Sequence, residues 1–207
     1  MAQETQPPIG RPDIVVADTA PLIHLSQGNA LHLLHEIGRA VAVVDMVVHE
    51  ATRDLAKPEA AALRAWVAEG MKPGSNTPVR YERTETGRVF ETALKADPDY
   101  RMKDGGETAI VQWLVEKVDG TDLQTIVIYE NGKVPNWINN RNLDADIDVL
   151  TTRAFLDLAE RRHLIGSAEA LWSRIEKAAP TANPRIAATI ARRHRPGRRR
   201  SDDGQGL

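Results

Sequence analysis

"IVVADTAPLI", residues 14–23, decides the fold: a short apolar run ends on a carboxylate, and the next element opens with a hydroxyl and a proline. The first four residues are apolar and mostly β-branched, which is typical of a strand buried on both faces. From Thr19 onward the apolar residues recur at helical spacing. The stretch therefore predicts a buried strand that leads, through Asp18, into a helix.

The same alternation continues along the chain. Apolar runs predict buried strands at 41–45, 125–130 and 146–151 and a short strand at 79–82. Helical spacing predicts helices at 19–37, 46–55, 58–70, 87–96, 107–118, 152–166 and 167–178, whereas 131–142 has the composition of a loop. Strands that alternate with helices predict an α/β fold, in three α/β/α layers around a mainly parallel sheet.

A length of 207 residues, 42% of them hydrophobic, suits one domain with some additional material. We expect residues 1–12 to be a disordered lead-in, 13–178 the domain and 179–207 a basic, flexible tail. The net charge is −2, and six tail arginines within 192–200 contribute +6, so the remainder carries −8. An acidic body of this kind repels a polyanion unless a cation intervenes.

Several classes of protein are disfavoured by composition. The absence of cysteine excludes disulfides, thiolate zinc sites and cysteine nucleophiles. No apolar run approaches the ~18 residues of a membrane span, and the N-terminus lacks the pattern of a secretory signal. Aromatic residues, at 4%, argue against a stacking platform for bases but not against phosphate binding. A cytoplasmic protein without a membrane partner is expected.

Four acids fall where strands end or helices begin: Asp18, Glu50, Glu107 and Glu130. Each alone has a structural interpretation, such as a helix cap for Asp18 or a dipole partner for Glu107. In a parallel sheet, however, the crevice lies beyond the carboxyl ends of the strands. Converging carboxylates raise one another's pKa unless a cation neutralises them. Oxygen ligands without cysteine suit Mg²⁺ or Mn²⁺.

Four sequence blocks carry a resemblance: "VVADTAPLIHLSQGNALHLL", "VAVVDMVVHEATRD", "GGETAIVQWLVE", and "TIVIYENG" followed by "DIDVLTTRAFLDLAERRHLI". In order and spacing they resemble PIN-domain proteins, in particular an uncharacterised bacterial branch of the toxin-type PIN ribonucleases, over residues 13–178. The resemblance implies a PIN-like fold and a Mg²⁺- or Mn²⁺-dependent endoribonuclease that hydrolyses RNA phosphodiester bonds. It also implies an antitoxin that inserts a basic segment into the acidic crevice, and a homodimer.

The resemblance also implies residue roles. Asp18, Glu107 and Glu130 would bind metal, Glu50 would be a further catalytic acid, and Thr19 and Asn131 would orient ligands or water. Many relatives have two acids where this chain has Glu130 and Asn131, which leaves the number of metals and the activity of the site open. Three further acids, Asp144, Asp146 and Asp148, are candidates to compensate.

Other interpretations stay open. The chain is alternatively a catalytically inactive PIN-like module that binds RNA or protein. A nucleotide-binding domain of the Rossmann kind is disfavoured because no glycine-rich loop follows the first strand. Trp137 is either a packing residue or a nucleobase contact. The tail either contacts RNA or a partner protein, or is merely solvated; its arginines are Arg192, Arg193, Arg195, Arg198, Arg199 and Arg200.

Overall fold

Five parallel strands form the centre of the molecule, in a computed structural model that describes residues 10–130, 133–141, 143–178 and 191–192. The strands are β1 (Ile14–Ala17), β2 (Ala40–Val44), β3 (Val79–Glu82), β4 (Gln124–Tyr129) and β5 (Asp146–Thr151). Their order is β3-β2-β1-β4-β5, with every neighbouring pair parallel. A short strand, β6 (Ala191–Arg192), pairs with β5 in the antiparallel sense. The expected α/β fold with a mainly parallel sheet is confirmed.

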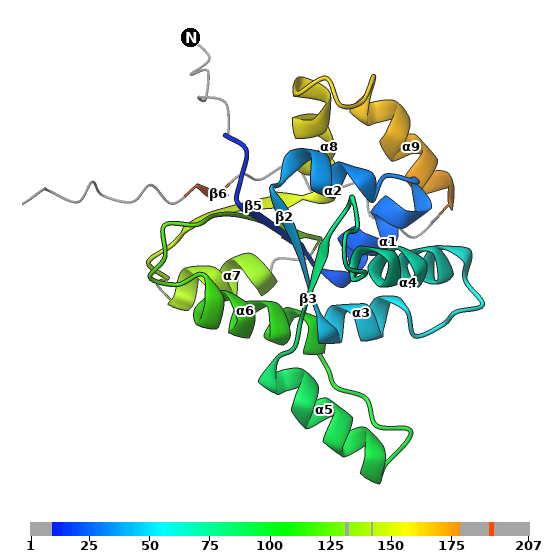
Figure 1. Ribbon diagram of the computed structural model, residues 1–207, viewed down its shortest axis with the longest axis vertical. Coiled ribbons are helices and arrows are strands. Elements are labelled where there is room, and N and C mark those ends of the chain that lie inside the picture. Colours follow the sequence, from blue (N-terminus) through cyan, green and yellow to red (C-terminus); the bar gives the residue numbers. More distant parts are fainter. Residues whose placement is uncertain (1–9, 131–132, 142, 179–190, 193–207) are drawn as a thin grey trace, which may run out of the picture.

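Helices cover both faces of the sheet (Figure 1). They are α1 (Thr19–Gln27), α2 (His32–Ile37), α3 (Asp45–Ala51), α4 (Pro58–Gly70), α5 (Glu85–Ala96), α6 (Gly105–Lys117), α7 (Lys133–Arg141), α8 (Thr152–Arg161) and α9 (Ala168–Ala178). One face carries α6 and α7, and the other carries α1, α2, α4, α8 and α9. At the carboxyl edge of the sheet, α3 packs against both α1 and α6. Beyond that edge, α5 projects from the body (Figure 1).

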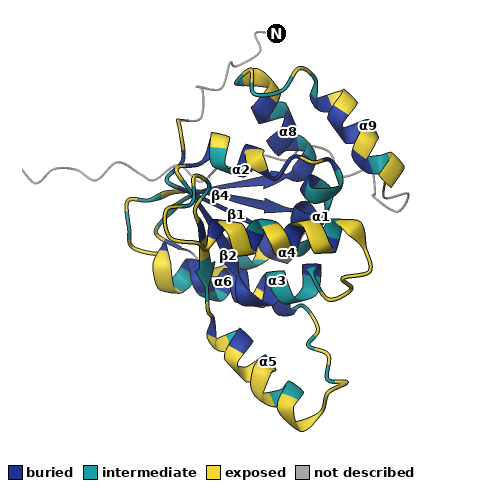
Figure 2. Cartoon of the chain, turned by 45° about the vertical axis from the view of Figure 1, so that its right-hand side comes forward, coloured by how far each residue is buried: buried dark blue, intermediate teal, exposed yellow. Residues whose placement is uncertain are grey.

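The core lies on both sides of the two central strands. All four residues of β1 are buried, and Ile126, Val127 and Ile128 of β4 are at most 1% exposed (Figure 2). Each fully buried aliphatic side chain of this kind contributes roughly 1.5–3 kcal/mol. The β-branched runs that were predicted to be strands buried on both faces therefore form the centre of the sheet.

The predicted helix over 19–37 is wrong in one respect, because the chain breaks into α1 and α2. Asn29 has a left-handed backbone with φ of 53°, and its amide donates to the Ser26 carbonyl. At Gly28, a Cβ atom would lie 3.0 Å from Ile175 and 3.1 Å from Leu171. The helix therefore ends at the left-handed Asn29, and α9, from a distant part of the sequence, packs closely on the preceding Gly28.

The segment predicted as a loop at 131–142 is also wrong, because most of it forms α7. Its buried residues, Val134 and Ile138, are 0% and 5% exposed and are spaced by one helical turn. Pro135 lies in the first turn, where the missing amide costs no intrahelical hydrogen bond. The asparagines that suggested a loop, including Asn136, Asn139 and Asn140, occupy the exposed side of this helix.

The helix predicted at 46–55 ends earlier, at Ala51, where the Thr52 hydroxyl donates to the Val48 carbonyl. The end of the expected lead-in is ordered, since the Pro12 carbonyl accepts from the Arg39 amide and the Gly10 carbonyl from Arg162. Residues 1–9, and all of the expected tail except Ala191 and Arg192, lie outside the described residues. Within the described ranges, no helix has the length and apolarity needed to cross a bilayer.

Candidate acidic site at the carboxyl edge of the sheet

The sheet order changes its winding direction beside β1. From β1 the chain proceeds outward to β2 and β3 on one side, whereas β4 and β5 lie on the other side. The direction of winding therefore reverses between β1 and β4, and open α/β sheets bind ligands at this reversal, beyond the carboxyl ends of the strands. Asp18 directly follows β1, and Glu130 directly follows β4.

Asp18 is fixed by the ends of both central strands. Its amide donates to the Ile128 carbonyl at 2.8 Å, and its side chain accepts from the Thr19 amide at 2.7 Å. The residue is 3% exposed. Asp18 is thus the N-cap of α1, as its structural interpretation predicted, and it is also a nearly inaccessible carboxyl group at the reversal point.

The other three predicted acids lie close enough to Asp18 for their charges to affect its pKa. The pKa of Asp18 is raised from 3.8 to about 7, and burial is the largest cause. The charges of Glu107, Glu50 and Glu130 contribute to this rise, whereas the hydrogen bond from the Thr19 amide opposes it. Three carboxylates from α3, α6 and the end of β4 therefore act on one buried carboxyl group.

Glu50 is oriented by two donors. Its Oε2 accepts from the Thr19 hydroxyl at 2.9 Å, and its Oε1 accepts from the Gly106 amide at 3.0 Å. Burial raises the pKa of Glu50, both hydrogen bonds lower it, Glu107 raises it and Arg53 lowers it. Thr19, predicted to orient a group at the site, therefore contacts Glu50 through its hydroxyl and Asp18 through its amide.

The Gly105–Gly106 pair allows α6 to approach Glu50. A Cβ atom on Gly106 would lie 2.8 Å from Glu50 Oε2 and 3.1 Å from Thr19 Oγ1. On Gly105 it would lie 2.6 Å from the end of the Met46 side chain. All three distances are shorter than normal contacts, so neither position accommodates a side chain without movement of its neighbours. The glycines thereby place Glu107, which is 9% exposed, beside Asp18 and Glu50 in the first turn of α6.

Glu130 is shared between the site and the start of α8. Its Oε1 accepts from the Thr152 amide at 3.2 Å and lies 3.5 Å from Nδ1 of His24. The His24 ring also packs edge-to-face on Trp172, with ring centroids 5.8 Å apart. His24 could not be assigned to this site from the sequence, because nothing in the 19–37 segment alone shows that it faces the end of β4.

Other candidates are placed elsewhere. Asp146 and Asp148 pair with Gln124 and Ile126 in the amino-terminal half of the β4–β5 ladder, so they do not compensate at the carboxyl edge. Asp144 precedes that strand, and its amide donates to Asp119. Asn131 and the tail arginines Arg193, Arg195, Arg198, Arg199 and Arg200 lie outside the described residues. The Arg192 backbone pairs with Asp148 in β6.

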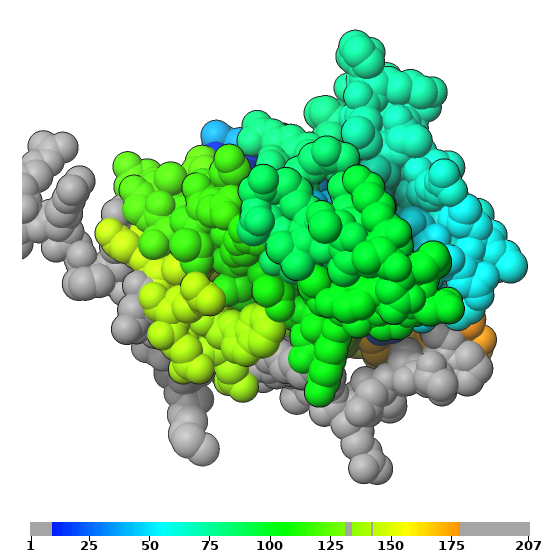
Figure 3. Space-filling model, turned by 90° about the horizontal axis from the view of Figure 1, so that it is seen from below, coloured from blue at the N-terminus to red at the C-terminus, as the bar shows by residue number. Residues whose placement is uncertain are grey.

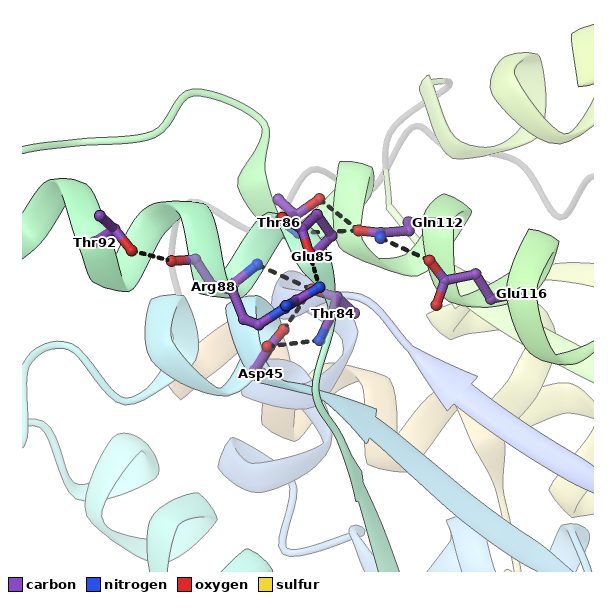
Figure 4. A network of polar contacts seen from close by, with 9 residues as sticks. Asp45, Thr84, Glu85, Thr86, Arg88, Thr92, Gln112 and Glu116 are labelled. Carbon is purple, nitrogen blue, oxygen red and sulfur yellow. Dashed lines mark hydrogen bonds and ion pairs between the residues drawn. The ribbon is translucent and has the colours of Figure 1, made fainter.

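Sequence reasoning missed a second buried acid at this edge, Asp45. Its Oδ1 accepts from the Thr84 hydroxyl and its Oδ2 from the Thr84 amide, each at 2.8 Å (Figure 4). Thr84 in turn caps α5 by accepting from the Gly87 amide at 3.0 Å. A Cβ atom on Gly87 would lie 2.0 Å from Asp45 Oδ2. Asp45 ends an apolar run just as Asp18 does, but it fastens α5 to the end of β2.

The donor set matches a hard divalent cation, since it consists of carboxylate oxygens around a carboxyl group whose pKa the others raise. Within the described residues, no three acidic or histidine side chains stand close enough to hold one ion together. Binding of an ion by three of these carboxylates therefore requires side-chain movement, and Glu50 would exchange hydrogen bonds for metal contacts if it took part.

Fold and site together define a three-layer α/β/α domain with acidic side chains gathered where its parallel sheet changes winding direction. Comparison with protein-family models, with curated proteins and with solved structures finds no match to this chain.

Proposed function

We propose that this protein is a Mg²⁺- or Mn²⁺-dependent ribonuclease of the PIN type. One observation supports the proposal above all: three carboxylates act on the buried carboxyl group of Asp18 at the point where the sheet reverses its winding. Such an arrangement costs stability in the absence of a cation, because each added negative charge makes ionisation of Asp18 less favourable. A structural cap alone requires only the Thr19 amide.

Asp18, Glu107 and Glu130 would hold the cation, with Glu50 as a further acid beside them. A bound divalent ion would supply a water of lowered pKa and polarise the scissile phosphate. The Thr19 hydroxyl and the Gly106 amide fix the Glu50 carboxylate in position. The chain apart from its arginine-rich tail carries −8, so it repels a polyanion unless a cation intervenes.

Cleavage of RNA is the direct test. Purified protein should cleave single-stranded RNA with Mg²⁺ or Mn²⁺ and should lose this activity with EDTA or in Asp18→Asn. Asparagine is as good an N-cap as aspartate, so this variant should keep its fold. Glu36→Gln, at an exposed position on α2, is the matched control and should cleave like the wild type. Absence of metal-dependent cleavage over a range of RNAs, or equal cleavage by Asp18→Asn, would overturn the proposal.

A second candidate function is binding of RNA or protein without catalysis. It is favoured by the separation of the acids, since no three of them within the described residues are placed to share an ion. It is also favoured by Glu130, whose side chain already accepts from the Thr152 amide. RNA binding that is equal in Mg²⁺ and EDTA, without cleavage, would establish this function in place of the first.

The antitoxin, the homodimer and the RNA contacts of the tail remain predictions. A small protein encoded beside this chain and co-purifying with it would support the antitoxin. Sedimentation of the purified protein would decide the dimer. Removal of residues 192–200 should weaken RNA binding and reduce its dependence on salt, because up to six phosphate contacts would be lost.

A further inference from the structure

A cleft of about 470 Å³ lies away from the hydrogen bonds of the acidic site, between the start of α5, the outer side of α6 and the end of α7. Figure 3 views the molecule from the side of α5, with α7 in yellow-green beside the green of α5 and α6. A volume of this size is within the range of small-molecule sites, roughly 300–1,000 Å³. Thr108, which lines the cleft, directly follows Glu107 of the acidic site.

The walls of the cleft suit a planar ring. Val111 and Val115 line it from successive turns of α6, and Trp137 lines it from α7. Trp137 is half-buried, so part of this residue remains accessible in the cleft. An accessible indole opposite branched aliphatic side chains is a surface on which an aromatic heterocycle can stack.

The polar groups of the cleft are held in a fixed orientation (Figure 4). Gln112 Oε1 accepts from the Thr86 amide at 3.0 Å and from the Thr86 hydroxyl at 2.8 Å, and Gln112 Nε2 donates to Glu116 Oε1 at 2.8 Å. These contacts settle which end of the amide is the carbonyl. The Gln112 amide group has a second hydrogen besides the one donated to Glu116, and the Glu116 carboxylate has a second oxygen besides the one that accepts it. The cleft therefore offers a donor beside an acceptor, the complement of a nucleobase edge.

The end of α7 adds a cation. Arg141 lines the cleft together with Asn140, and both are exposed. Of the two acids that line it, Glu85 forms an ion pair with Arg88, whereas Glu116 accepts from the neutral amide of Gln112 and keeps its charge. A guanidinium next to a ring-sized cleft matches the phosphate of a nucleotide, since arginine binds phosphate in a bidentate manner.

We propose that this cleft binds a nucleobase, stacked on Trp137 and held at its edge by Gln112 and Glu116, with the adjoining phosphate on Arg141. The base belongs to an RNA strand or to a free nucleotide. The RNA source rests on the proposed function, since a strand in the cleft would pass Thr108 toward Glu107. The base-binding cleft itself does not depend on hydrolysis.

Calorimetric titration of the full chain in EDTA tests the proposal without cleavage. The ligands are the four nucleoside 5′-monophosphates, the corresponding nucleosides, ribose 5-phosphate and an RNA hexamer. We expect at least one nucleotide to bind, ribose 5-phosphate to bind at least about tenfold more weakly, and Trp137→Leu to lose about tenfold in affinity. Trp66→Leu, on the opposite face of the sheet in α4, should leave binding unchanged.

Arg141→Ala provides a second variant at an exposed position that the fold tolerates. It should weaken binding of the nucleotide about tenfold but leave the matching nucleoside unaffected, because only the phosphate contact is lost. A hexamer that binds at least tenfold more tightly than any nucleotide assigns the base to RNA, and equal affinity assigns it to a free nucleotide.

Binding of ribose 5-phosphate as tight as that of the nucleotides, unchanged affinity in Trp137→Leu, or no binding of any base-containing ligand overturns the proposal. These results are independent of the ribonuclease assay. Absence of metal-dependent cleavage by the wild type would overturn the proposed function but would not affect the proposal that the cleft binds a base.

Discussion

The Thr19 hydroxyl donates to Glu50 across two helices, 2.9 Å from Oε2, and thereby links the residue after Asp18 to the acid of α3. This hydrogen bond lowers the pKa of Glu50 against the effect of burial. Its removal is therefore expected to leave Glu50 more readily protonated and less well placed.

Thr19→Val should cost about 1–3 kcal/mol of unfolding free energy at pH 7, because a partly buried carboxylate loses a donor. Thr19→Ser retains the hydroxyl and should lose less than half as much. Chemical denaturation measures both values. A loss in Thr19→Ser larger than that in Thr19→Val would show that the methyl group, which valine retains, matters more than the hydrogen bond at this position.

Gly106→Ala should displace Glu50, since the new Cβ would lie 2.8 Å from its carboxylate. We expect a loss of about 1–3 kcal/mol in stability from overpacking and a marked loss of metal-dependent cleavage. Gly166→Ala is the matched control, because a Cβ there meets nothing within 4 Å. A Gly106→Ala variant with wild-type cleavage would show that the position of Glu50 is not required.

The stability that Asp18 contributes, measured as the difference between the wild type and Asp18→Asn, should fall as pH rises from about 4 to about 7. The folded-state pKa of Asp18 is about 7, above the ordinary value of 3.8, so the folded chain keeps a proton that the unfolded chain releases in this window. The full effect is on the order of 4 kcal/mol. Denaturation in metal-free buffer across this range measures it, and Asp18→Asn should flatten the profile and be more stable than the wild type at pH 8.

Divalent cations should restore the stability that is lost when Asp18 ionises. Mg²⁺ or Mn²⁺ binds the ionised carboxylates, so either ion should raise the melting temperature more at pH 8 than at pH 5. KCl at matched ionic strength controls for screening. The same rise in Asp18→Asn, or an equal rise with KCl, would argue against a specific ion at this site.

Asp45→Asn should destabilise the protein by about 1–3 kcal/mol, because one carboxylate oxygen that accepts from buried Thr84 is replaced by a donor. The loss should appear locally, as faster proteolysis in the 97–104 segment after α5. Asp99→Asn, at an exposed position in that segment, should change stability by no more than about 0.5 kcal/mol. Unchanged proteolysis in Asp45→Asn would show that α5 is held mainly by its packing.

The strands and the acids that follow them were predictable because both depend on local patterns. A doubly buried strand needs a β-branched run, and a carboxylate directly after it must lie at the carboxyl edge of the sheet, as Asp18 and Glu130 do. The glycine pair before Glu107 was recognisable as a helix entry. Its close approach to Glu50 was not, since the sequence does not state which helix lies opposite.

Some of the missed features depend on contacts between distant segments. The role of Asp45 follows from Thr84, and the close packing of Ile175 on Gly28 accompanies the break at Asn29. The helix α7 was missed for a different reason. Its asparagines and Pro135 are individually typical of loops, and only the spacing of Val134 and Ile138 indicates a helix.

The central position of β1 has a consequence for synthesis on the ribosome. Asp18 completes its contacts only when the Ile128 carbonyl is present, and β1 has β2 on one edge and β4 on the other. A nascent chain that stops short of β4 exposes an unpaired edge of its first strand, which is prone to pair with other chains. Pairing of such distant segments is also slow to form. The acidic cluster is therefore assembled late, after most of the polypeptide has been made.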